Sequence, residues 1–458
     1  MKVEPVLEEF ARAALGHGAR SKRLVEIARG LMRNPAASFP QAAADDAALE
    51  GTYRFLNNPE VEWTAILEPH FTGTVERIDA TDGPIVVVHD TTEAQFSGNR
   101  DIGRLRSSQS SGFFVHAALA VHGRIPLGLL GIQVLARDGA PKARRSGAES
   151  FVDPDKESTR WWTLPEAVRT RLGQRRVVHA MDRGADSYEL FSKLMEAGEA
   201  FVIRCGHDRR LAEDDNLKSK ALAAPVMLNR QVVLSRRKKH QLPRDRKIQP
   251  PRDERSAALE VHATTVELRR PAHLPKNGWP PIVQLNVVVV QEVEAPQGQE
   301  PVQWVLLTNL PVIDAKAVET IVDIYRQRWM IEEYFKALKT GCAYESRQLE
   351  SRDALVRALA ILAPLAWRLF QLRALCDLRP DDDATAALTA AEILALRHLA
   401  KKKLPPMPTV REAFLAVAAL GGHLKRNGNP GWMVLWKGWT RLVDVAAVLE
   451  SIQESDQS

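Results

Sequence analysis

The sequence is short of cysteine and of long uninterrupted hydrophobic runs. Its 458 residues include only three cysteines, Cys205, Cys342 and Cys376. Their wide spacing matches neither a disulfide framework nor a zinc site, so we expect a reducing cytoplasm. The most apolar stretch, residues 354–371, is interrupted by two arginines and a proline, whereas a membrane span needs about 20 apolar residues. The acidic N-terminus lacks the apolar core of a signal peptide, so we expect no membrane partner.

The sequence also lacks a large excess of charge of one sign, and aromatic residues make up only 6% of the chain. There are 63 Lys and Arg against 57 Asp and Glu, a formal net charge of +6. With 45% hydrophobic and 26% charged residues, the composition excludes a disordered, collagen-like or disulfide-scaffold protein. The length suggests about two to four domains. The mild positive charge permits a nucleic-acid partner but does not require one.

The first 70 residues or so have the apolar spacing of helices. In the stretch Ser21–Arg33, Leu24 and Ile27 recur at helical spacing on a core-facing side. Residues 20–33 hold five bases and one acid, which is typical either of a solvated helix face or of a helix that faces DNA. The bases are Arg20, Lys22, Arg23, Arg29 and Arg33.

The middle of the chain alternates between strand and helix patterns. Uniformly apolar runs of this kind are typical of a mixed α/β sheet covered on both faces. These runs are residues 85–89, 113–120, 127–135, 177–181 and 200–204. From 205 to about 310 the pattern is mainly β, with runs at 226–234, 257–268, 282–293 and 304–307. A basic segment, residues 236–255, interrupts this part and is typical of a solvated linker.

The last third of the chain is helical in pattern. Asp314 is expected to cap a long helix that reaches about Thr340, with Gly341 as its stop. A second helix is expected over residues 353–376, and two more between residues 410 and 452 around a turn rich in glycine and asparagine.

Three carboxylates stand out by position. Asp90 and Asp182 each follow a run that predicts a buried strand, and Glu332 lies on the long helix. Carboxylates brought together repel one another, and a divalent cation that prefers oxygen ligands relieves the repulsion. Such a site suits phosphodiester chemistry. Taken singly, an aspartate at a strand end is more often a turn former or helix cap.

The long helix places one acid among bases. At about 100° per residue, Tyr325, Arg328, Glu332, Lys336 and Lys339 fall within an arc of roughly 80°. The stripe is typical either of a solvated face with an Arg328–Glu332 pair or of a metal-binding carboxylate flanked by cations that grip phosphate.

The pattern Tyr325-x2-Arg328-x3-Glu332-x6-Lys339 resembles the YREK signature of bacterial DDE transposases. The closest likeness is to the cut-and-paste transposases of the insertion-sequence-four family, and it covers almost the whole chain. Similar fragments occur in the same order, with Gly184 where the family's second aspartate motif usually has glutamate. They are Leu49–Pro59, His89–Thr92, Asp182–Asp186, Trp304–Val312 and Arg328–Gly341.

The resemblance implies an α/β fold with a ribonuclease H-like, mixed-sheet catalytic core at residues 71–370, which contains a β-rich insert at about 205–310. A helical transposon-end DNA-binding domain would precede it at residues 1–70, and a helical dimerisation domain would follow at residues 371–458. The resemblance also implies that Asp90, Asp182 and Glu332 are catalytic and bind Mg²⁺ or Mn²⁺, with two ions in the site.

DNA contacts are implied for two groups of residues. Around the cleaved end the resemblance implies Tyr325, Arg328, Lys339, Lys336, Trp304, Trp329, Arg204 and Arg183, with Trp304 stacking on a flipped base. For recognition of the inverted ends it implies Arg20, Lys22, Arg23, Tyr53 and Arg54.

The expected function is therefore a transposase that binds inverted-repeat ends, cleaves them through a hairpin intermediate and joins the 3′-OH ends to target DNA. The partners would be double-stranded DNA and a second copy of the chain, in the cytoplasm of a bacterium at its nucleoid. Two alternatives remain open at this point. One is a catalytically silent repressor that only binds the ends, and the other is a different ribonuclease H-like DNA nuclease.

Overall fold

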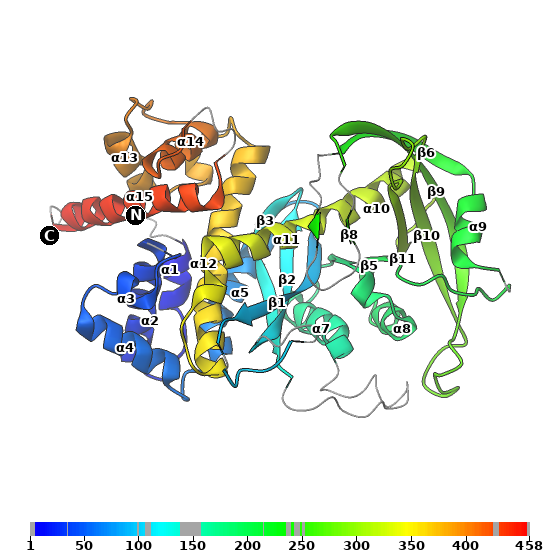
Figure 1. The fold of residues 1–458 in the computed structure, drawn as a ribbon, viewed down its shortest axis with the longest axis horizontal. Coiled ribbons are helices and arrows are strands. Elements are labelled where there is room, and N and C mark those ends of the chain that lie inside the picture. Colours follow the sequence, from blue (N-terminus) through cyan, green and yellow to red (C-terminus); the bar gives the residue numbers. More distant parts are fainter. Residues whose placement is uncertain are drawn as a thin grey trace. The chain divides into compact units, whose positions relative to one another are not determined.

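The computed structural model describes most of the chain, in two compact units (Figure 1). The described residues are 5–33, 35–98, 100–105, 111–137, 157–213, 215–234, 240–241, 248–249, 252–424 and 430–455. The first unit consists of residues 1–83, 91–139 and 330–458, and the second of residues 84–90 and 140–329. Most of the basic segment 236–255 lies outside the described residues.

The N-terminal part of the first unit is helical, as the sequence predicts. The helix that begins at Asp46 is capped by Asp45, whose carboxylate accepts a hydrogen bond from the Ala48 backbone N at 2.7 Å. Such a cap satisfies one of the backbone donors left over at a helix start. The helices are α1 (Pro5–Ala11), α2 (Gly18–Arg33), α3 (Phe39–Ala42), α4 (Asp46–Asn57) and α5 (Trp63–Asp79).

Four helices form the C-terminal part of the first unit and confirm the predicted helical pattern. They are α12 (Arg352–Leu378), α13 (Ala390–Leu399), α14 (Val410–Leu420) and α15 (Trp432–Ser455). Helix α12, yellow in Figure 1, is long and apolar enough by composition to cross a membrane, but 94% of its most apolar window is buried inside the protein. It is therefore a core helix of this unit.

Buried arginines join α12 and the segment before it to the N-terminal helices. Arg357 donates a hydrogen bond to the carbonyl oxygen of Val61 at 2.7 Å. Arg347 donates to the carbonyl oxygens of Pro35 and Ala37. A buried guanidinium requires such acceptors, because an unpaired buried charge is strongly destabilising. The joined residues are 296 to 312 positions apart in the sequence.

Both units contain strands. In the first unit, β2 (Ser111–His122) and β3 (Ile125–Leu135) form the antiparallel hairpin that the sequence predicts. Strand β1 (Val86–Phe96) neighbours β2 in the sheet order and belongs to both units, with the boundary after Asp90.

In the second unit the strand order is β1-β4-β5-β11-β10-β9-β6. Residues 205–310 are rich in strands, as predicted, and these strands continue the sheet of β1, β4 and β5 through pairing of β11 with β5. The strands are β4 (Val178–Met181), β5 (Ala200–Arg204), β6 (Val226–Leu234), β9 (Arg255–Arg269), β10 (Ile282–Val293) and β11 (Gln303–Thr308). The helices include α7 (Arg160–Leu172), α8 (Tyr188–Glu196), α9 (Leu217–Ala223) and α10 (Ala315–Gln327).

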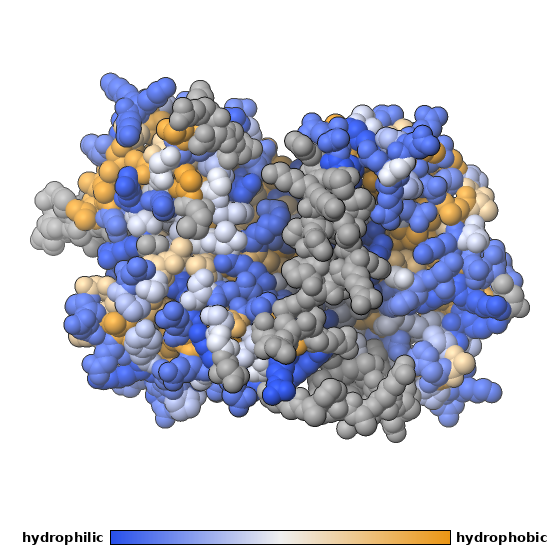
Figure 2. Space-filling view, viewed as in Figure 1, coloured by the Kyte–Doolittle hydropathy of each residue, from blue (hydrophilic) through white to orange (hydrophobic). Residues whose placement is uncertain are grey.

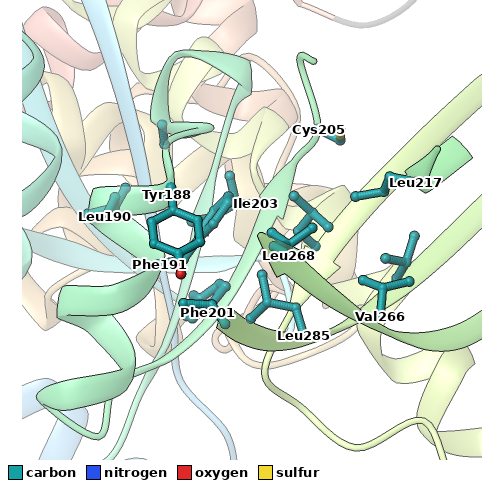
Figure 3. Packing of buried hydrophobic residues seen from close by; sticks show 14 of the residues in the cluster. Tyr188, Leu190, Phe191, Phe201, Ile203, Cys205, Leu217, Val266, Leu268 and Leu285 are labelled. Atoms are coloured by element: carbon teal, nitrogen blue, oxygen red, sulfur yellow. The ribbon is translucent and has the colours of Figure 1, made fainter. Parts of the chain in front are cut away.

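The hydrophobic core of the second unit lies between this sheet and α8 (Figure 3). Phe191 of α8 stacks on Phe201 of β5, with ring centroids 5.9 Å apart and an interplanar angle of 10°. Full burial of such a side chain contributes about 1.5–3 kcal/mol. Met181, which belongs to this core, directly precedes Asp182 in the chain.

The two units divide the chain differently from the three predicted domains. The predicted N-terminal and C-terminal domains both fall in the first unit, and α5 continues past the expected boundary at residue 70. The three domains describe where functions are expected, and their boundaries stay a prediction.

The apolar C-terminal tail buries most of its large side chains within the first unit. Trp436 and Trp439 are 4% and 2% exposed. The tail is therefore covered largely by its own chain, and the expectation of dimerisation rests on the family resemblance. Figure 2 shows smaller apolar groups among hydrophilic ones over the C-terminal helices.

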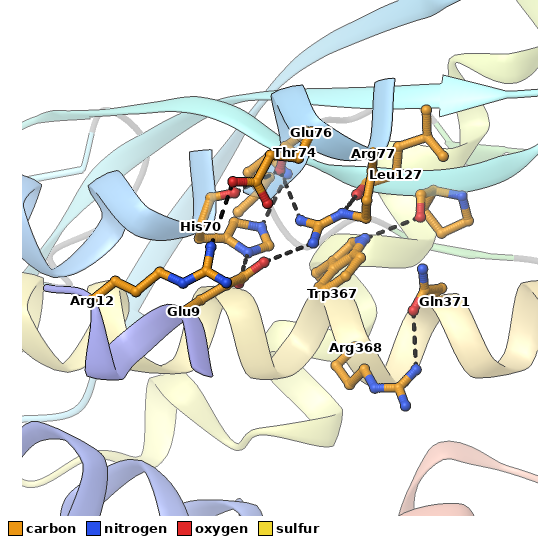
Figure 4. Close-up of polar contacts among 12 residues, drawn as sticks. Glu9, Arg12, His70, Thr74, Glu76, Arg77, Leu127, Trp367, Arg368 and Gln371 are labelled. Carbon is orange, nitrogen blue, oxygen red and sulfur yellow. Dashed lines mark hydrogen bonds and ion pairs between the residues drawn. The ribbon is translucent and has the colours of Figure 1, made fainter. Parts of the chain in front are cut away.

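A buried polar network joins four elements of the first unit (Figure 4). Glu9 of α1 accepts hydrogen bonds from His70 Nδ1 and Arg77 Nη1, each at 2.7 Å. The backbone N of Leu129 donates to His70 Nε2 at 3.2 Å, so the imidazole is neutral with its proton on Nδ1. The Arg77 guanidinium lies 4.2 Å from the ring centroid of Trp367 in α12.

Acid should weaken this network. Burial lowers the pKa of His70 below its ordinary 6.5, against the attraction of Glu9. Burial raises the pKa of Glu9, but His70 and Arg77 outweigh it and the net pKa falls below 4.5. For both groups the unfolded chain binds more protons, so the stability contribution is present above the unfolded pKa and is lost as the pH falls through the folded pKa.

We therefore expect the thermal unfolding midpoint to fall as the pH drops from about 7 to 5, because His70 contributes a slope of up to about 1.4 kcal/mol per pH unit there, whereas the Glu9 contribution is lost only at lower pH. The His70→Gln variant removes the titrating imidazole and should flatten the profile between pH 7 and 5. Parallel profiles for both proteins would contradict a role for His70.

Helices α14 and α15 cross at two glycines. A Cβ on Gly438 would lie 1.7 Å from the carbonyl oxygen of Val417, and a Cβ on Gly421 would lie 1.9 Å from that of Val434. Neither position has room for a methyl group, because the obstacle is backbone.

Gly438→Ala should therefore destabilise the α14–α15 pair by about 1–3 kcal/mol or more, the usual cost of overpacking. Gly431→Ala is the matched control, since a Cβ there meets nothing within 4 Å. Thermal unfolding and amide hydrogen exchange of the two helices would measure the difference, and equal behaviour of the two variants would rule out the close crossing.

Candidate active site

Two predicted metal ligands occupy matching positions on neighbouring parallel strands. Strands β1 and β4 pair with Val88 opposite Ala180, and Asp90 and Asp182 each follow two residues later. Paired strands lie about 4.8 Å apart, and the carboxyl ends of parallel strands meet at one sheet edge. The backbone therefore brings the two aspartates side by side.

The two aspartates differ in their local structure. Asp182 directly follows β4, as predicted, and its Oδ1 accepts a hydrogen bond from the Gly184 N at 2.8 Å in a short 3-10 turn. Asp90 was predicted to follow a strand end, which is wrong. It lies within β1, which continues to Phe96 because this strand goes on beside β2 after its pairing with β4 ends.

Arg204 extends the same row on a third strand. Met181 of β4 pairs with Ile203 of β5, so Asp182 lies opposite Arg204. Burial lowers the pKa of the Arg204 guanidinium, and the charge of nearby Arg183 lowers it further. Positive charge is thus concentrated beside the predicted metal ligands.

Arg328 compensates the charge of Asp90. It ends α10, and its Nη1 donates to Asp90 Oδ2 at 3.0 Å. The two side chains are only 8% and 17% exposed, so water screens the pair weakly. The partners are 238 positions apart, so sequence reasoning missed the pair and no spacing signal could have indicated it.

Aromatic side chains surround this arginine. Tyr325 is buried, and burial raises the pKa of its phenol although the charges of Arg328 and Arg204 act in the opposite direction. The ring of Trp304 meets that of Tyr325 edge to face, with centroids 5.5 Å apart. Trp329 is 50% exposed, and the Arg328 guanidinium lies 5.2 Å from its ring centroid. Tyr325, Arg328, Trp304 and Trp329, which were all predicted to contact DNA, thus lie close together.

The space beside Gly184 is occupied by Trp161. A Cβ on Gly184 would lie 3.0 Å from both Asp182 Oδ1 and Trp161 Cζ2, which is tighter than ordinary van der Waals contact. The indole of Trp161 is 4% exposed and belongs to the core. A residue without a side chain therefore suits this turn.

Glu332 and the two lysines lie in the first unit. The predicted long helix is confirmed, with Asp314 as its cap and its end at Gly341. Glu332 is half-buried, and Lys336 forms an ion pair within its own helix. Lys339 pairs with Glu345 at 3.1 Å. After α10 the chain continues as α11 (Trp329–Lys336) and a π-helical turn, Ala337–Gly341.

The two aspartates are the candidate donors for a divalent cation. Within the described residues, no group of three or more His, Cys, Asp or Glu side chains is gathered for a metal ion. Asp90 and Asp182 both supply carboxylate oxygens, which hard cations such as Mg²⁺ prefer, so this pair fits. Glu332 belongs to the other unit, and its approach to them stays a prediction.

The predicted end-recognition residues lie on α2 and α4 of the first unit. Lys22 is exposed, whereas Arg20, Arg23 and Arg54 form ion pairs with neighbouring glutamates. Tyr53 is half-buried. Any DNA contact by these arginines would therefore replace an existing pair.

A groove of about 460 Å³ runs between α2 and the segment from α3 to α4. Arg23, Arg29 and Arg33 line it, and the last two are exposed. Arg29 and Arg33 were noted only as bases of this helix, and their place on the groove adds them to the candidate DNA contacts.

Comparison with known protein families finds two matches. Residues 6–61 match the family described as transposase DNA-binding, and residues 155–367 match the family described as transposase DDE domain. The second match includes Asp182 and Glu332 and begins after Asp90.

Among solved structures, this chain is similar to a piggyBac transposase in a synaptic complex with hairpin DNA. The sequence identity is 10%, the similarity covers 82% of this chain and 74% of that chain, and the TM-score is 0.38. The likeness is weak, and no residue role is taken from it.

The Asp90–Arg328 pair should contribute to stability. Arg328→Gln leaves a shielded carboxylate without its cation, so we expect a loss of about 3 kcal/mol in the free energy of unfolding. Arg326→Gln is the matched control, because Arg326 pairs with Asp323 at the surface and should change stability by less than about 0.5 kcal/mol. Urea unfolding measures both, and equal small losses would mean that the pair adds nothing.

Proposed function

The chain is a DDE transposase, and we propose that it is a cut-and-paste enzyme of the insertion-sequence-four family that acts on the inverted-repeat ends of its own element. Water hydrolyses one phosphodiester bond at each end and frees a 3′-OH. That hydroxyl attacks a phosphodiester of the opposite strand, which closes a hairpin and releases the flanking DNA with its own 3′-OH, and a second water hydrolyses the hairpin bond. The regenerated 3′-OH ends then attack phosphodiesters of target DNA, and each attack forms a new bond to the element and releases a target 3′-OH.

The observation that carries this proposal is the row of charged residues across three parallel strands. Asp90 of β1, Asp182 directly after β4 and Arg204 of β5 fall at matching positions when the strand registers are continued by one or two residues. Two carboxylates and a cation at one sheet edge provide both a place for a divalent cation and a contact for the phosphate that reacts.

In the proposed site Asp90, Asp182 and Glu332 would hold two Mg²⁺ or Mn²⁺ ions. When bound, such ions activate the attacking oxygen and stabilise the leaving oxygen. The protein's part is to orient the carboxylates. Arg328 fixes one oxygen of Asp90, and the Gly184 backbone fixes one oxygen of Asp182. Such pre-organisation lowers the cost of reaching the reactive geometry.

The cations around this row are proposed to hold the DNA end. Arg183, Arg204 and Arg328 contact phosphates, as do Tyr325, Lys336 and Lys339 from the long helix. Support comes from the crowding of guanidinium groups around Arg204, which is electrostatically unfavourable until an anion arrives.

Trp304 is proposed to stack on a base flipped out of the end, and Trp329 to line the pocket for that base. Stacking of this kind contributes about 1–3 kcal/mol per base. The half-exposed ring of Trp329 and the edge contact between Trp304 and Tyr325 support an aromatic environment for the base.

Recognition of the inverted repeats is assigned to α2 and α4. Lys22 and Arg29 offer exposed charge along α2, whereas Arg33 pairs with Asp444 at 2.9 Å. Together with Arg33, the residues Arg20, Arg23, Tyr53 and Arg54 complete the surface. Two copies of the chain would hold two ends together, at the bacterial nucleoid.

The test uses purified protein, Mg²⁺ and DNA that carries the inverted repeats flanking the chain's own gene. The wild-type protein should make double-strand breaks at the repeat tips. Glu332→Gln and Asp182→Asn should bind the tips but cut them at least about 100-fold more slowly, as expected when a positioned charged group of a catalytic site is lost. Glu319→Gln, on the exposed face of α10, is the matched control and should cut normally.

Results other than these would indicate a different function. Tip-specific binding without cutting by the wild-type protein would indicate a silent repressor. Cutting that ignores the repeats would indicate another nuclease. Appreciable cutting by Glu332→Gln would remove that residue from the catalytic set.

A further inference from the structure

The turn after β4 is fastened to the loop after β5 by one buried carboxylate. Asp186 lies at the end of the turn that begins with Asp182, and its side chain is fully buried. Its Oδ2 accepts hydrogen bonds from the backbone N of Gly206 at 2.6 Å and of His207 at 3.0 Å. Its Oδ1 accepts from Arg209 Nη1 at 2.5 Å.

The same arginine also holds the backbone of the turn. Arg209 Nη2 donates to the carbonyl oxygen of Asp186 at 2.8 Å, and its guanidinium lies 5.5 Å from the ring centroid of Phe191 in the core of α8. The Asp186 backbone N donates to the carbonyl oxygen of Arg183 at 3.2 Å. We call this set of contacts the Asp186 clamp.

The Asp186 clamp connects the segments that carry aligned site residues. Asp182 and Arg183 precede Asp186 on the turn, and Arg204 precedes Gly206 on the loop. A Cβ on Gly206 would lie 3.4 Å from the carbonyl oxygen of Arg183, so the two segments are in contact. The buried carboxylate itself has no room to meet DNA or a metal ion.

We infer that Asp186 is a positioning residue for the reaction, which rests on the function proposed above. By holding the turn against the loop, it fixes the distance between the Asp182 carboxylate and the Arg204 guanidinium. The metal ligand and the phosphate contact thereby face the same scissile phosphate. The bonds that form and break are those of the proposed reaction, and Asp186 acts only through Asp182, Arg183 and Arg204.

Asp186→Asn tests this inference because it keeps the shape of the side chain and removes its charge. We expect the variant to bind repeat-tip DNA within about twofold of wild type but to cut it about 10–100-fold more slowly at saturating DNA, the range typical for residues that orient metal ligands. The loss should thus fall on kcat and not on KM. Mn²⁺ binding, followed by electron paramagnetic resonance without DNA, should weaken by a similar factor.

The chain offers a matched control in Glu292. Its carboxylate is also buried, pairs with Arg255 through both oxygens and accepts a hydrogen bond from the Val302 N at 2.9 Å, but it belongs to β10 in the insert. Glu292→Gln should lower the thermal midpoint as Asp186→Asn does while leaving cutting and Mn²⁺ binding unchanged. Equal loss of cutting in both variants would reduce Asp186 to a general stability role and overturn the inference.

Arg209→Gln keeps the inference testable if Asp186→Asn does not fold, because it leaves the two backbone donors in place. It should reduce the cutting rate less than Asp186→Asn does. The double variant should cut no more slowly than Asp186→Asn alone, since both substitutions disrupt the same Asp186 clamp. If the wild-type protein cuts the repeat tips and these variants also cut them and bind Mn²⁺ normally, the inference about Asp186 is overturned and the proposed function stands. Absence of repeat-tip cutting by the wild-type protein would instead overturn the proposed function.

Discussion

The hydrogen-bond register of β1, β4 and β5 is the constraint on which the candidate active site depends. It places Asp90, Asp182 and Arg204 in one row just beyond the paired segments of these three parallel strands. Because side chains alternate between faces, a slip of one residue would turn a member of the row to the opposite side of the sheet. The contacts of Arg328 and Asp186 refine the positions that this register sets.

Charge compensation in the second unit follows a repeated arrangement. Each of three shielded carboxylates meets one guanidinium, in the pairs Asp90–Arg328, Asp186–Arg209 and Glu292–Arg255. Buried charges are tolerated only with good partners, so these pairs limit where the chain can move. Arg183 and Arg204 add further positive charge near the row, which favours an anionic ligand there.

The sequence was sufficient for features that arise from local signals. Apolar runs predicted the strands, and Asp314 and Gly341 marked the ends of the long helix because caps and stops are formed by neighbouring residues. It was insufficient where distant segments meet. The extension of β1 beyond Asp90 depends on β2, the partner of Arg328 is 238 positions away, and Trp161 fills the space beside Gly184. The place of Glu332 in the site was predicted from the family signature and not from packing.

The buried arginines of the first unit have a consequence for the order of folding. Arg347 and Arg357 bind backbone oxygens of residues 35, 37 and 61, which leave the ribosome about 300 residues earlier. At about 5–20 residues per second, that interval is on the order of 15–60 s. The segment that matches the DNA-binding family is thus synthesised well before the arginines that complete its contacts. A nascent chain that ends before Arg347 lacks both arginines that bind these carbonyl oxygens.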